Sequence, residues 1–301
     1  PAALCGLVGL RPTVGCWPGA GIVPISHTRD TPGPMTRTVA DAAFLDGVVT
    51  GETDPMRPAS LKGLRLGIPR AHFFENLDPE VERIAAGTVA ALEAAGVEFV
   101  EVDPRTMLEI NARVGFPVAL YEVVRDLTAY LDAHGTGLSM QDLLDGIGSP
   151  DVRGIVASQM GDAAIPEAVY RQALEVDRPL LIAAHAALFA DNRVEALLFP
   201  TAPLPAAPIG DDETVELNGE RVPTFPTFIR NTDSGSNAGL PGISVPAGIT
   251  ASGLPVGMEL DGPAGSDRRL LAIAAAVEEA LDVRTRPPLA QSDRRQGMEL
   301  A

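Results

Sequence analysis

The sequence contains little cysteine, and the pattern around the cysteines excludes the common cysteine-based sites. Only Cys5 and Cys16 occur among 301 residues, without a C-x-x-C pair and without histidines at metal-ligand spacing beside them. Such sparse cysteine fits a reducing cytoplasm, which is the location that we expect. The zinc-protease motif, the glycine-rich dinucleotide turn and the Walker loop are also missing. We therefore expect neither a metal nor a cofactor.

Long apolar stretches and basic residues are scarce as well. No run of about 18 apolar residues occurs, and the first residues lack the charged and apolar regions of a signal peptide. Lys and Arg number 23 against 40 Asp and Glu, which gives a formal net charge of -17. This excess repels phosphate backbones and anionic lipid surfaces. Nucleic acid and membranes are therefore not expected as partners.

The residues that are present predict a globular protein with many loops. Hydrophobic residues make up 46% of the chain, alongside 30 Gly and 27 Pro. One large domain over residues 1–301 is the simplest organisation. Within it, helical periodicity predicts a helical layer or insertion at about 106–191, with interruptions at Gly115, Pro117 and Gly148. A polar tail follows at about 284–301.

The order of predicted elements indicates an α/β fold. Residues 64–68 and 97–102 are typical of strands, and the helix between them should begin at Asp78 and Pro79. A strand, a helix and a second strand in this order are typical of parallel pairing. Asn218 and Gly219 predict a β-hairpin, and Ser266 should begin an amphipathic helix.

An earlier helix is predicted to begin at Thr36 or Thr38 and to end near Val49. Its expected apolar face consists of Val39, Ala42, Ala43 and Phe44.

Motifs of independent catalysis are not evident. The segment GISVP at 242–246 is the nearest approach to the G-x-S-x-G turn of serine hydrolases, but it ends in proline and its Ser244 falls in a predicted strand. The four histidines have no evident acid and nucleophile partners. Carboxylates are abundant, and we interpret Asp261, Asp267 and Glu278 as loop, first-turn and surface residues.

Two long segments resemble a known family. The first is PAALCGLVGLRPTVG at 1–15, followed by GIVP at 21–24 and DTPGPMTRTVADA at 30–42. The second is NTDSGSNAGLPGISVPAG at 231–248, followed by GLPVGMEL at 253–260. Together they resemble the amidase-signature family, and the second is most similar to its mandelamide and indoleacetamide hydrolase branch. The resemblance implies a mixed twisted sheet covered by helices, of which this chain holds the C-terminal two-thirds.

The resemblance also implies a mechanism. The family hydrolyses a carboxylic amide to acid and ammonia through an acyl-serine, using a Ser-cis-Ser-Lys triad. Its nucleophile stands in a segment of the type G-G-S-x-R-x-P-A-A, four residues before the proline that matches Pro1. We therefore expect no catalytic residue of the triad in this chain, and a fragment that is inactive alone. Because the chain begins with Pro1 rather than Met, we also expect a processed or truncated polypeptide.

Substrate contacts are expected in the second segment. Asn231, Thr232 and Asn237 offer polar side chains that can orient an amide, and Phe228 offers an apolar wall. Asn and Thr also cap helices and turns, so a structural role remains the alternative. In the helical middle, four aromatic residues are further candidates for an acyl pocket: Phe116, Tyr121, Tyr130 and Tyr170.

Three functions remain open from the sequence. The first is an amidase for a small-molecule amide, such as an aryl-acetamide. The second is a protein similar to an amidotransferase subunit, which passes ammonia to a partner enzyme. The third is a non-catalytic binding protein that retains the fold. A homodimer is compatible with each of them.

Overall fold

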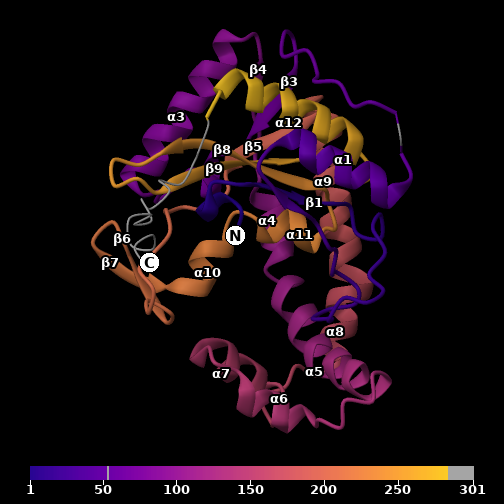
Figure 1. Cartoon of the computed structure of the whole chain (residues 1–301). Coiled ribbons are helices and arrows are strands. Elements are labelled where there is room, and N and C mark those ends of the chain that lie inside the picture. Colours follow the sequence, from indigo (N-terminus) through magenta and orange to yellow (C-terminus); the bar gives the residue numbers. More distant parts are fainter. Residues whose placement is uncertain (53, 284–301) are drawn as a thin grey trace, which may run out of the picture.

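The computed structural model describes residues 1–52 and 54–283. Its centre is a seven-stranded mixed sheet in the order β2-β1-β8-β9-β5-β3-β4 (Figure 1). The strands of this sheet are β1 (Val8–Arg11), β2 (Met35–Thr36), β3 (Arg65–Ile68), β4 (Glu98–Glu101), β5 (Ala196–Pro200), β8 (Gly242–Ile249) and β9 (Pro255–Asp261). Helices cover the sheet, so the fold class expected from the sequence is confirmed.

The predicted parallel pairing is found at one side of this sheet. Strand β3 pairs in parallel with both β4 and β5. Helix α3 (Pro79–Ala94) makes the crossover from β3 to β4, and the Asp78 side chain accepts hydrogen bonds from the backbone N–H groups of Glu80 and Val81. This side chain satisfies donors that have no partner inside the helix, which explains why the helix begins there.

The other side of the sheet is antiparallel and brings the two family-like segments together. β8 pairs with β9 over most of its length, and β1 pairs with β8. A Cβ atom on Gly257 would stand 2.7 Å from both the Ala3 Cβ and the Ser244 Oγ. Glycine is therefore required where the start of the chain, in the short 3₁₀ turn Ala3–Cys5, packs on β9.

Two hydrophobic cores lie on the two faces of the sheet. One face is covered by α3 together with α1 (Val39–Thr50) and α12 (Asp267–Leu281), whose apolar sides pack on the strands (Figure 1). The opposite face is covered by α4 (Arg105–Asn111), the first turn of α5 (Gly115–Ala133), α9 (Arg178–Asn192) and the residues that directly follow α11 (Asp233–Asn237). The short α2 (Arg70–Phe73) supplies Phe73 to this second core.

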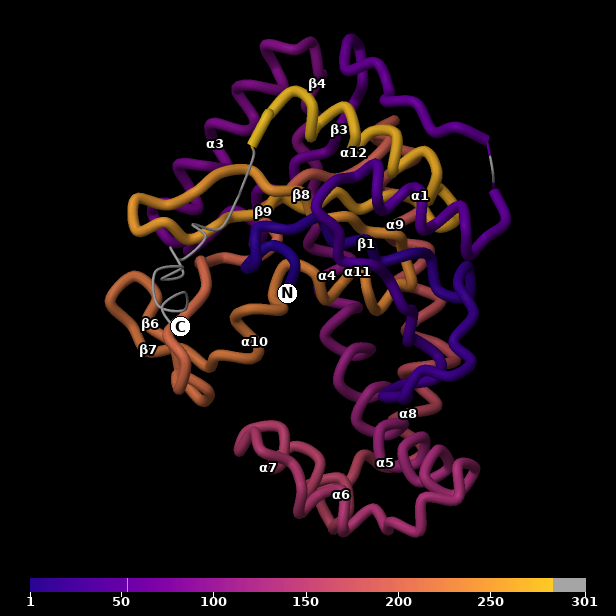
Figure 2. Tube along the Cα trace, viewed as in Figure 1, coloured from indigo at the N-terminus to yellow at the C-terminus, as the bar shows by residue number. Residues whose placement is uncertain are grey.

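The remaining elements extend away from the sheet. α5 leaves the sheet and meets α6 (Met140–Gly146) and α7 (Pro150–Ser158) at its far end (Figure 2). α8 (Glu167–Arg171) and a π-helical segment (Gln172–Asp177) lead back to α9. The predicted hairpin is confirmed as β6 (Thr214–Leu217) and β7 (Glu220–Pro223), and α10 (Thr224–Ile229) follows it. Asn218 and Gly219 adopt positive φ angles of 53° and 86°, as a two-residue turn of this kind requires.

Several local predictions need correction. α1 begins after Thr38 as expected and buries Val39, Ala42 and Ala43, but Phe44 is 71% exposed, because it points away from the sheet. The helices are interrupted at residues 112–114 and, as predicted, at Gly148, but Gly115 and Pro117 themselves lie inside the first turn of α5. Proline is tolerated there, since the first N–H groups of a helix have no intrahelical partner.

The polar tail expected at about 284–301 lies outside the described residues. Among the residues that the structure does describe, no helix is long and apolar enough to cross a membrane.

Asp267 joins the first segment of the chain to the start of α12, and its loss should destabilise the fold. Its carboxylate accepts hydrogen bonds from the Thr13 backbone N–H at 2.7 Å and from the Thr13 hydroxyl at 2.6 Å. We expect Asp267→Ala to lower the free energy of unfolding by about 3 kcal/mol, because two charge-assisted bonds to a buried carboxylate are lost. Urea unfolding measures this. Asp132→Ala on the exposed side of α5 is the control and should stay within about 0.5 kcal/mol; equal losses would contradict the role of Asp267.

Candidate functional site

The four pocket residues predicted from the sequence have different surroundings. Phe228 packs on a small cluster formed by Leu204, Val215 and Leu217, beside the β6–β7 hairpin. Thr232 lies just before α11, where its hydroxyl bonds to the Ile229 carbonyl at 3.3 Å. The two asparagines are fully buried. Whether any of the four touches a substrate stays a prediction.

Asn231 joins segments that are distant in the sequence. Its side-chain amide donates hydrogen bonds to the carbonyl oxygens of Phe73, at 3.0 Å, and Pro200, at 2.7 Å. These carbonyls belong to α2 and to the end of β5. Because a buried carbonyl needs a donor, Asn231 holds this part of the structure together from within.

Asn237 is the centre of a second polar network. Its side-chain oxygen accepts a hydrogen bond from Arg29 Nη1, and its amide nitrogen donates to Asn111 Oδ1 at 2.7 Å. Asn111 in turn donates to Asp233 Oδ2 at 2.8 Å. Arg178 donates to the Asn237 carbonyl at 3.0 Å. The network fixes α11 against the loop around residue 29 and against α4.

A largely apolar cavity of about 260 Å³ adjoins this network, between α5, α7 and α10. Ligand pockets in proteins begin at roughly 300 Å³, so the cavity suits a small apolar group. Phe116 of α5 and Phe225 of α10 lie with their ring centroids 6.5 Å apart. The lining consists of Ile25, Arg29, Gly115, Phe116, Ala119, Leu120, Val123, Val152, Ile155, Val156, Phe225, Ile229 and Asp233.

None of the four predicted pocket residues is in this lining, although Ile229 and Asp233 are their neighbours in the sequence. Of the aromatic candidates in the helical middle, Phe116 lines the cavity. The rings of Tyr121 and Tyr170 instead stack on each other, with their centroids 4.0 Å apart. The Tyr130 ring stacks on His134, with a centroid distance of 4.1 Å.

A buried charged cluster, which the sequence analysis missed, lies under the start of the chain. Arg11 Nη2 is 2.6 Å from Asp261 Oδ1, and Arg11 Nη1 is 3.8 Å from Glu259 Oε1. Burial raises the pKa of both Glu259 and Asp261, while the positive charge of Arg11 opposes this effect. Asp261 is thus a buried strand residue rather than a loop residue. The sequence did contain a signal for this cluster. Residues 259 and 261 are two apart along a strand, which places both side chains on the same face of the sheet.

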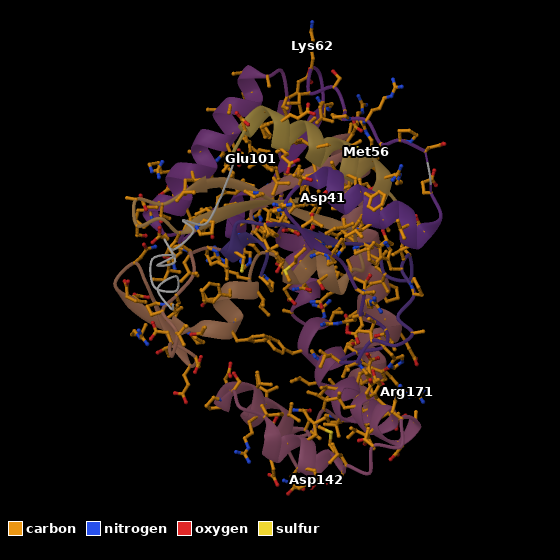
Figure 3. All side chains as sticks on the ribbon, in the orientation of Figure 1. Asp41, Met56, Lys62, Glu101, Asp142 and Arg171 are labelled. Carbon is orange, nitrogen blue, oxygen red and sulfur yellow. The ribbon has the colours of Figure 1, made fainter. Side chains whose placement is uncertain are left out.

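The start of the chain lies close to this cluster. Ala2 and Ala3 are buried, and the 3₁₀ turn Ala3–Cys5 packs on β9. Ser244 is buried in β8 with its hydroxyl 2.7 Å from that of Thr201, so it lies in a strand as predicted. Lys62, the one lysine of the sequence, projects into solvent far from this region (Figure 3).

Two of the histidines have clear structural roles. His185 is buried in α9, with Nδ1 3.0 Å from the Leu181 carbonyl and Nε2 3.3 Å from the Ser234 hydroxyl of α11. Burial lowers the pKa of His185 to about 4, so the ring is neutral at working pH. His72 Nε2 lies 3.4 Å from the Arg230 carbonyl.

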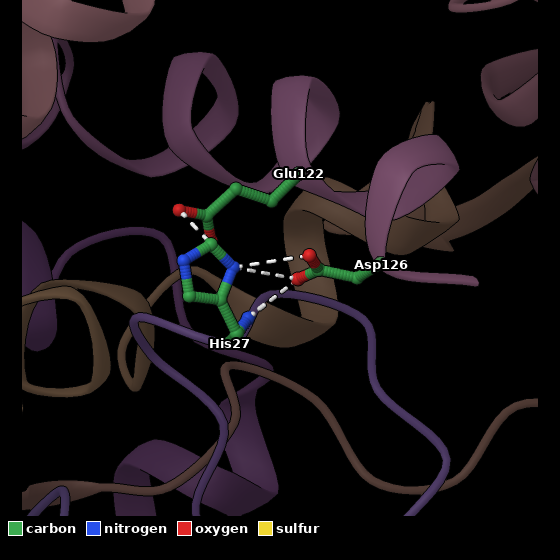
Figure 4. A group of neighbouring side chains, drawn as sticks. All are labelled: His27, Glu122 and Asp126. Carbon is green, nitrogen blue, oxygen red and sulfur yellow. Dashed lines mark hydrogen bonds and ion pairs between the residues drawn. The ribbon is translucent and has the colours of Figure 1, made fainter. Parts of the chain in front are cut away.

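A third histidine belongs to a group with metal-ligand residue types. His27, Glu122 and Asp126 have candidate ligand atoms within 4.8 Å of one another (Figure 4). The His27 ring nitrogen already lies 2.9 Å from Asp126 Oδ2. Glu122 accepts bonds from the hydroxyls of Ser26, at 2.5 Å, and Tyr170, at 2.7 Å. The group therefore forms a complete hydrogen-bonded network that holds the 25–30 loop against α5, and its geometry requires no cation.

Replacing Asn231 should test its structural role. Asn231→Ala leaves the Phe73 and Pro200 carbonyls without this donor, and we expect a loss of about 3 kcal/mol in the free energy of unfolding, measured with urea. Thr232→Ala is the control and should cost less than about 1 kcal/mol, since the Thr232 hydroxyl is only half-buried. Unchanged stability, combined with a raised KM for an amide in an active enzyme, would instead place Asn231 in the pocket.

The His27 ion pair should give a pH-dependent stabilisation. Burial lowers the pKa of His27, but the Asp126 hydrogen bond and the charges of Glu122, Asp126 and Asp30 outweigh it, and the pKa is raised. The folded state thus binds the proton more tightly, so the stabilisation is present below pH about 6.5 and disappears as pH rises through the folded-state pKa.

We therefore expect His27→Gln to lower Tm by about 1 °C at pH 5.5 and by less at pH 8.5, because solvent screens the exposed imidazole. His134→Gln, a change at an exposed histidine, is the control. A Tm difference for His27→Gln that grows with pH would contradict the assignment.

Comparisons with known proteins agree with the fold and with the two family-like segments. A family model described as Amidase matches residues 1–271. The chain is 48% identical over 284 residues to indoleacetamide hydrolase of Agrobacterium tumefaciens (strain Ach5), covering 94% of this chain and 61% of that protein. It is 39% identical over 293 residues to mandelamide hydrolase of Pseudomonas putida, covering 93% of this chain and 56% of that protein.

Solved structures give the same result. A crystal structure of an amidase superposes with a TM-score of 0.76 and 31% identity, covering 93% of this chain and 60% of that one. A peptide amidase in complex with the competitive inhibitor chymostatin superposes with a TM-score of 0.74 and 27% identity, covering 96% and 61%. The chain thus spans about three-fifths of the length of these relatives. The matched residues and the shared architecture together show that the chain belongs to the amidase family.

Proposed function

We propose that this chain forms the acyl-binding part of an enzyme that hydrolyses the amide of an apolar, aryl-substituted carboxylic acid. The observation that carries the proposal is the cavity between α5, α7 and α10, which has an apolar wall and a polar end at Arg29 and Asp233. Relatives named indoleacetamide hydrolase and mandelamide hydrolase support an aryl group as its occupant. An apolar cavity gains affinity for such a group by removing its surface from water.

The family resemblance supplies the reaction. A serine oxygen, in a segment that the resemblance places before Pro1, forms a bond to the amide carbon. The C–N bond then breaks, and the nitrogen leaves as ammonia with the proton from the serine. Water next attacks the ester, which releases the carboxylic acid and restores the serine. Backbone N–H groups beside the serine stabilise the oxyanion in both steps.

Residues of this chain fix the position of the serine segment relative to the cavity. The Arg11 cluster ties β1, which follows the start of the chain, to β9 through an ion pair of 2.6 Å between Arg11 and Asp261. Arg11 also donates to the carbonyls of Leu240, at 3.1 Å, and Thr232, at 3.4 Å, which flank α11. A segment that precedes Pro1 is thereby held in register with the polar end of the cavity. Fixing the reacting groups in this way lowers the entropic part of the barrier.

Helices α5, α7 and α10 surround this site. We infer a single amidase domain in which the helices at about 106–191 form a layer that shapes the cavity, in a cytoplasmic protein that acts without nucleic acid. Assembly as a homodimer is compatible with this arrangement.

The proposal is tested by intact mass together with ammonia release from indole-3-acetamide, mandelamide and acetamide. A polypeptide that carries the family's lysine and serines before Pro1 should hydrolyse the two aryl amides with kcat/KM at least about 100-fold above that for acetamide, because the apolar group fills the cavity. The 31.4 kDa chain alone should be inert. Ammonia release by that species would refute the placement of the nucleophile, and no release by the longer polypeptide would refute the amidase proposal in favour of a binding protein.

A matched pair of phenylalanines tests the cavity itself. Phe116→Ala should lower kcat/KM for an aryl amide by about tenfold, since an apolar wall is lost. Phe44→Ala, on the exposed face of α1, should leave it unchanged. Equal effects would mean that the cavity does not bind the acyl group.

A further inference from the structure

We propose that Arg29 and Asp233, at the polar end of the cavity, together recognise a neutral carboxamide and discriminate against the corresponding carboxylate. This inference rests on the proposed function, because it takes the cavity as the acyl pocket, and it adds a selectivity device to that site. Arg29 and Asp233 are the charged residues in an otherwise apolar lining.

Arg29 has hydrogen-bond donors that the rest of the described chain does not use. Its Nη1 donates to the Gly115 carbonyl at 2.9 Å and to Asn237 Oδ1. Nε is buried without a hydrogen-bond partner, Nη2 makes no hydrogen bond within residues 1–52 and 54–283, and no carboxylate there lies within 4.0 Å of the guanidinium. Burial lowers the pKa of Arg29 from its ordinary value, and the opposing charges of Asp233, Asp30 and Glu122 offset this only in part. The guanidinium stays charged and presents N–H groups to a ligand.

Asp233 offers the complementary group. Its Oδ2 accepts the hydrogen bond from Asn111 at 2.8 Å, whereas Oδ1 has no hydrogen bond from any described residue. The polar end of the cavity therefore has one free acceptor, Asp233 Oδ1, and free donors on Arg29 Nε and Nη2. They are close enough for the Asp233 charge to act on Arg29, but they do not form an ion pair with each other.

Both groups are held in place around Gly115, the first residue of α5. Arg29 Nη1 bonds to the Gly115 carbonyl, and a Cβ atom at this position would stand 3.3 Å from Asp233 Oδ2 and 2.6 Å from Asn237 Nδ2. The missing side chain thus lets the network approach the helix start closely. Because Asn111 and Asn237 link the two residues, neither can shift far without breaking a buried hydrogen bond.

The chemistry of this pair matches an amide and not an acid. A primary carboxamide has a carbonyl oxygen for Arg29 and an N–H for Asp233, so both free groups are satisfied. A carboxylate satisfies Arg29 but places a negative oxygen opposite Asp233 with no proton between them. In a cavity with apolar walls such repulsion is weakly screened. The product of amide hydrolysis is therefore bound less tightly than the substrate, which favours its release.

The test is equilibrium binding of a matched pair, phenylacetamide and phenylacetate, to the purified 301-residue chain at neutral pH by isothermal titration calorimetry. The two ligands have the same shape and differ in charge and in the N–H donor. We expect the amide to bind at least about tenfold more tightly, which corresponds to about 1.4 kcal/mol. No hydrolysis is needed for this measurement, so its result is independent of the nucleophile.

The variant Asp233→Asn sharpens the test. The side-chain oxygen of the new asparagine can still accept the hydrogen bond from Asn111. Its NH₂ group then takes the position of the free acceptor, Asp233 Oδ1. The N–H of phenylacetamide then faces the new NH₂ group and has no acceptor, whereas the phenylacetate oxygen can accept a hydrogen bond from that NH₂ group. The preference should therefore reverse, with phenylacetate binding more tightly. Val156→Ala, at the apolar wall, is the matched control and should weaken both ligands by a similar factor. A Tm measurement verifies that each variant is folded.

Each outcome decides the inference. A reversed preference in Asp233→Asn, with an unchanged preference in Val156→Ala, supports it. Equal or tighter binding of phenylacetate by the unaltered chain overturns it, as does a loss of both ligands by the same factor in folded Asp233→Asn. If neither ligand binds the unaltered chain, the cavity is not the ligand site. Amide preference without ammonia release by the longer polypeptide rejects the proposed function alone, whereas ammonia release without amide preference rejects this inference alone.

Discussion

Arg11 extends from β1 into the interior and meets two carboxyl groups that β9 presents on one face, Glu259 and Asp261. An unpaired charge at this depth would cost several kcal/mol, so the guanidinium and the carboxylate must stay together. Gly242 has no side chain at this point, because a Cβ atom there would collide with the side chains of Arg11, Glu259 and Asp261. The antiparallel half of the sheet is therefore arranged around one buried ion pair.

This ion pair also sets the position of the candidate site. The remaining donors of Arg11 bond to the carbonyls before and after α11, and α11 carries Asp233 and Asn237. Through Asn237 the connections continue to Arg29 and to the start of α5, where the cavity begins. A continuous set of buried polar contacts thus runs from the start of the chain to the cavity. In such a network each bond restricts the next, which keeps the site in one geometry.

Much of the fold was predictable because local signals agree with the tertiary arrangement. Asp78 with Pro79, Thr38, and Asn218 with Gly219 act through backbone groups of their immediate neighbours, so their roles can be inferred from spacing alone. Phe44 shows the limit of this approach. Its position on the helix suggested burial, but which side of a helix meets the sheet depends on a distant part of the chain.

The candidate site shows the same division. The sequence by itself determined the elements, the α/β class and the resemblance of two segments to the amidase family, since all of these depend on neighbouring residues or on long matching strings. Only the tertiary structure decided that Asp261 is buried against Arg11, that Asn231 holds two carbonyls, and that Arg29 and Asp233 line one cavity. These pairings join residues up to 250 positions apart. Their energies depend on burial and on the exclusion of water, which no local pattern of residues specifies.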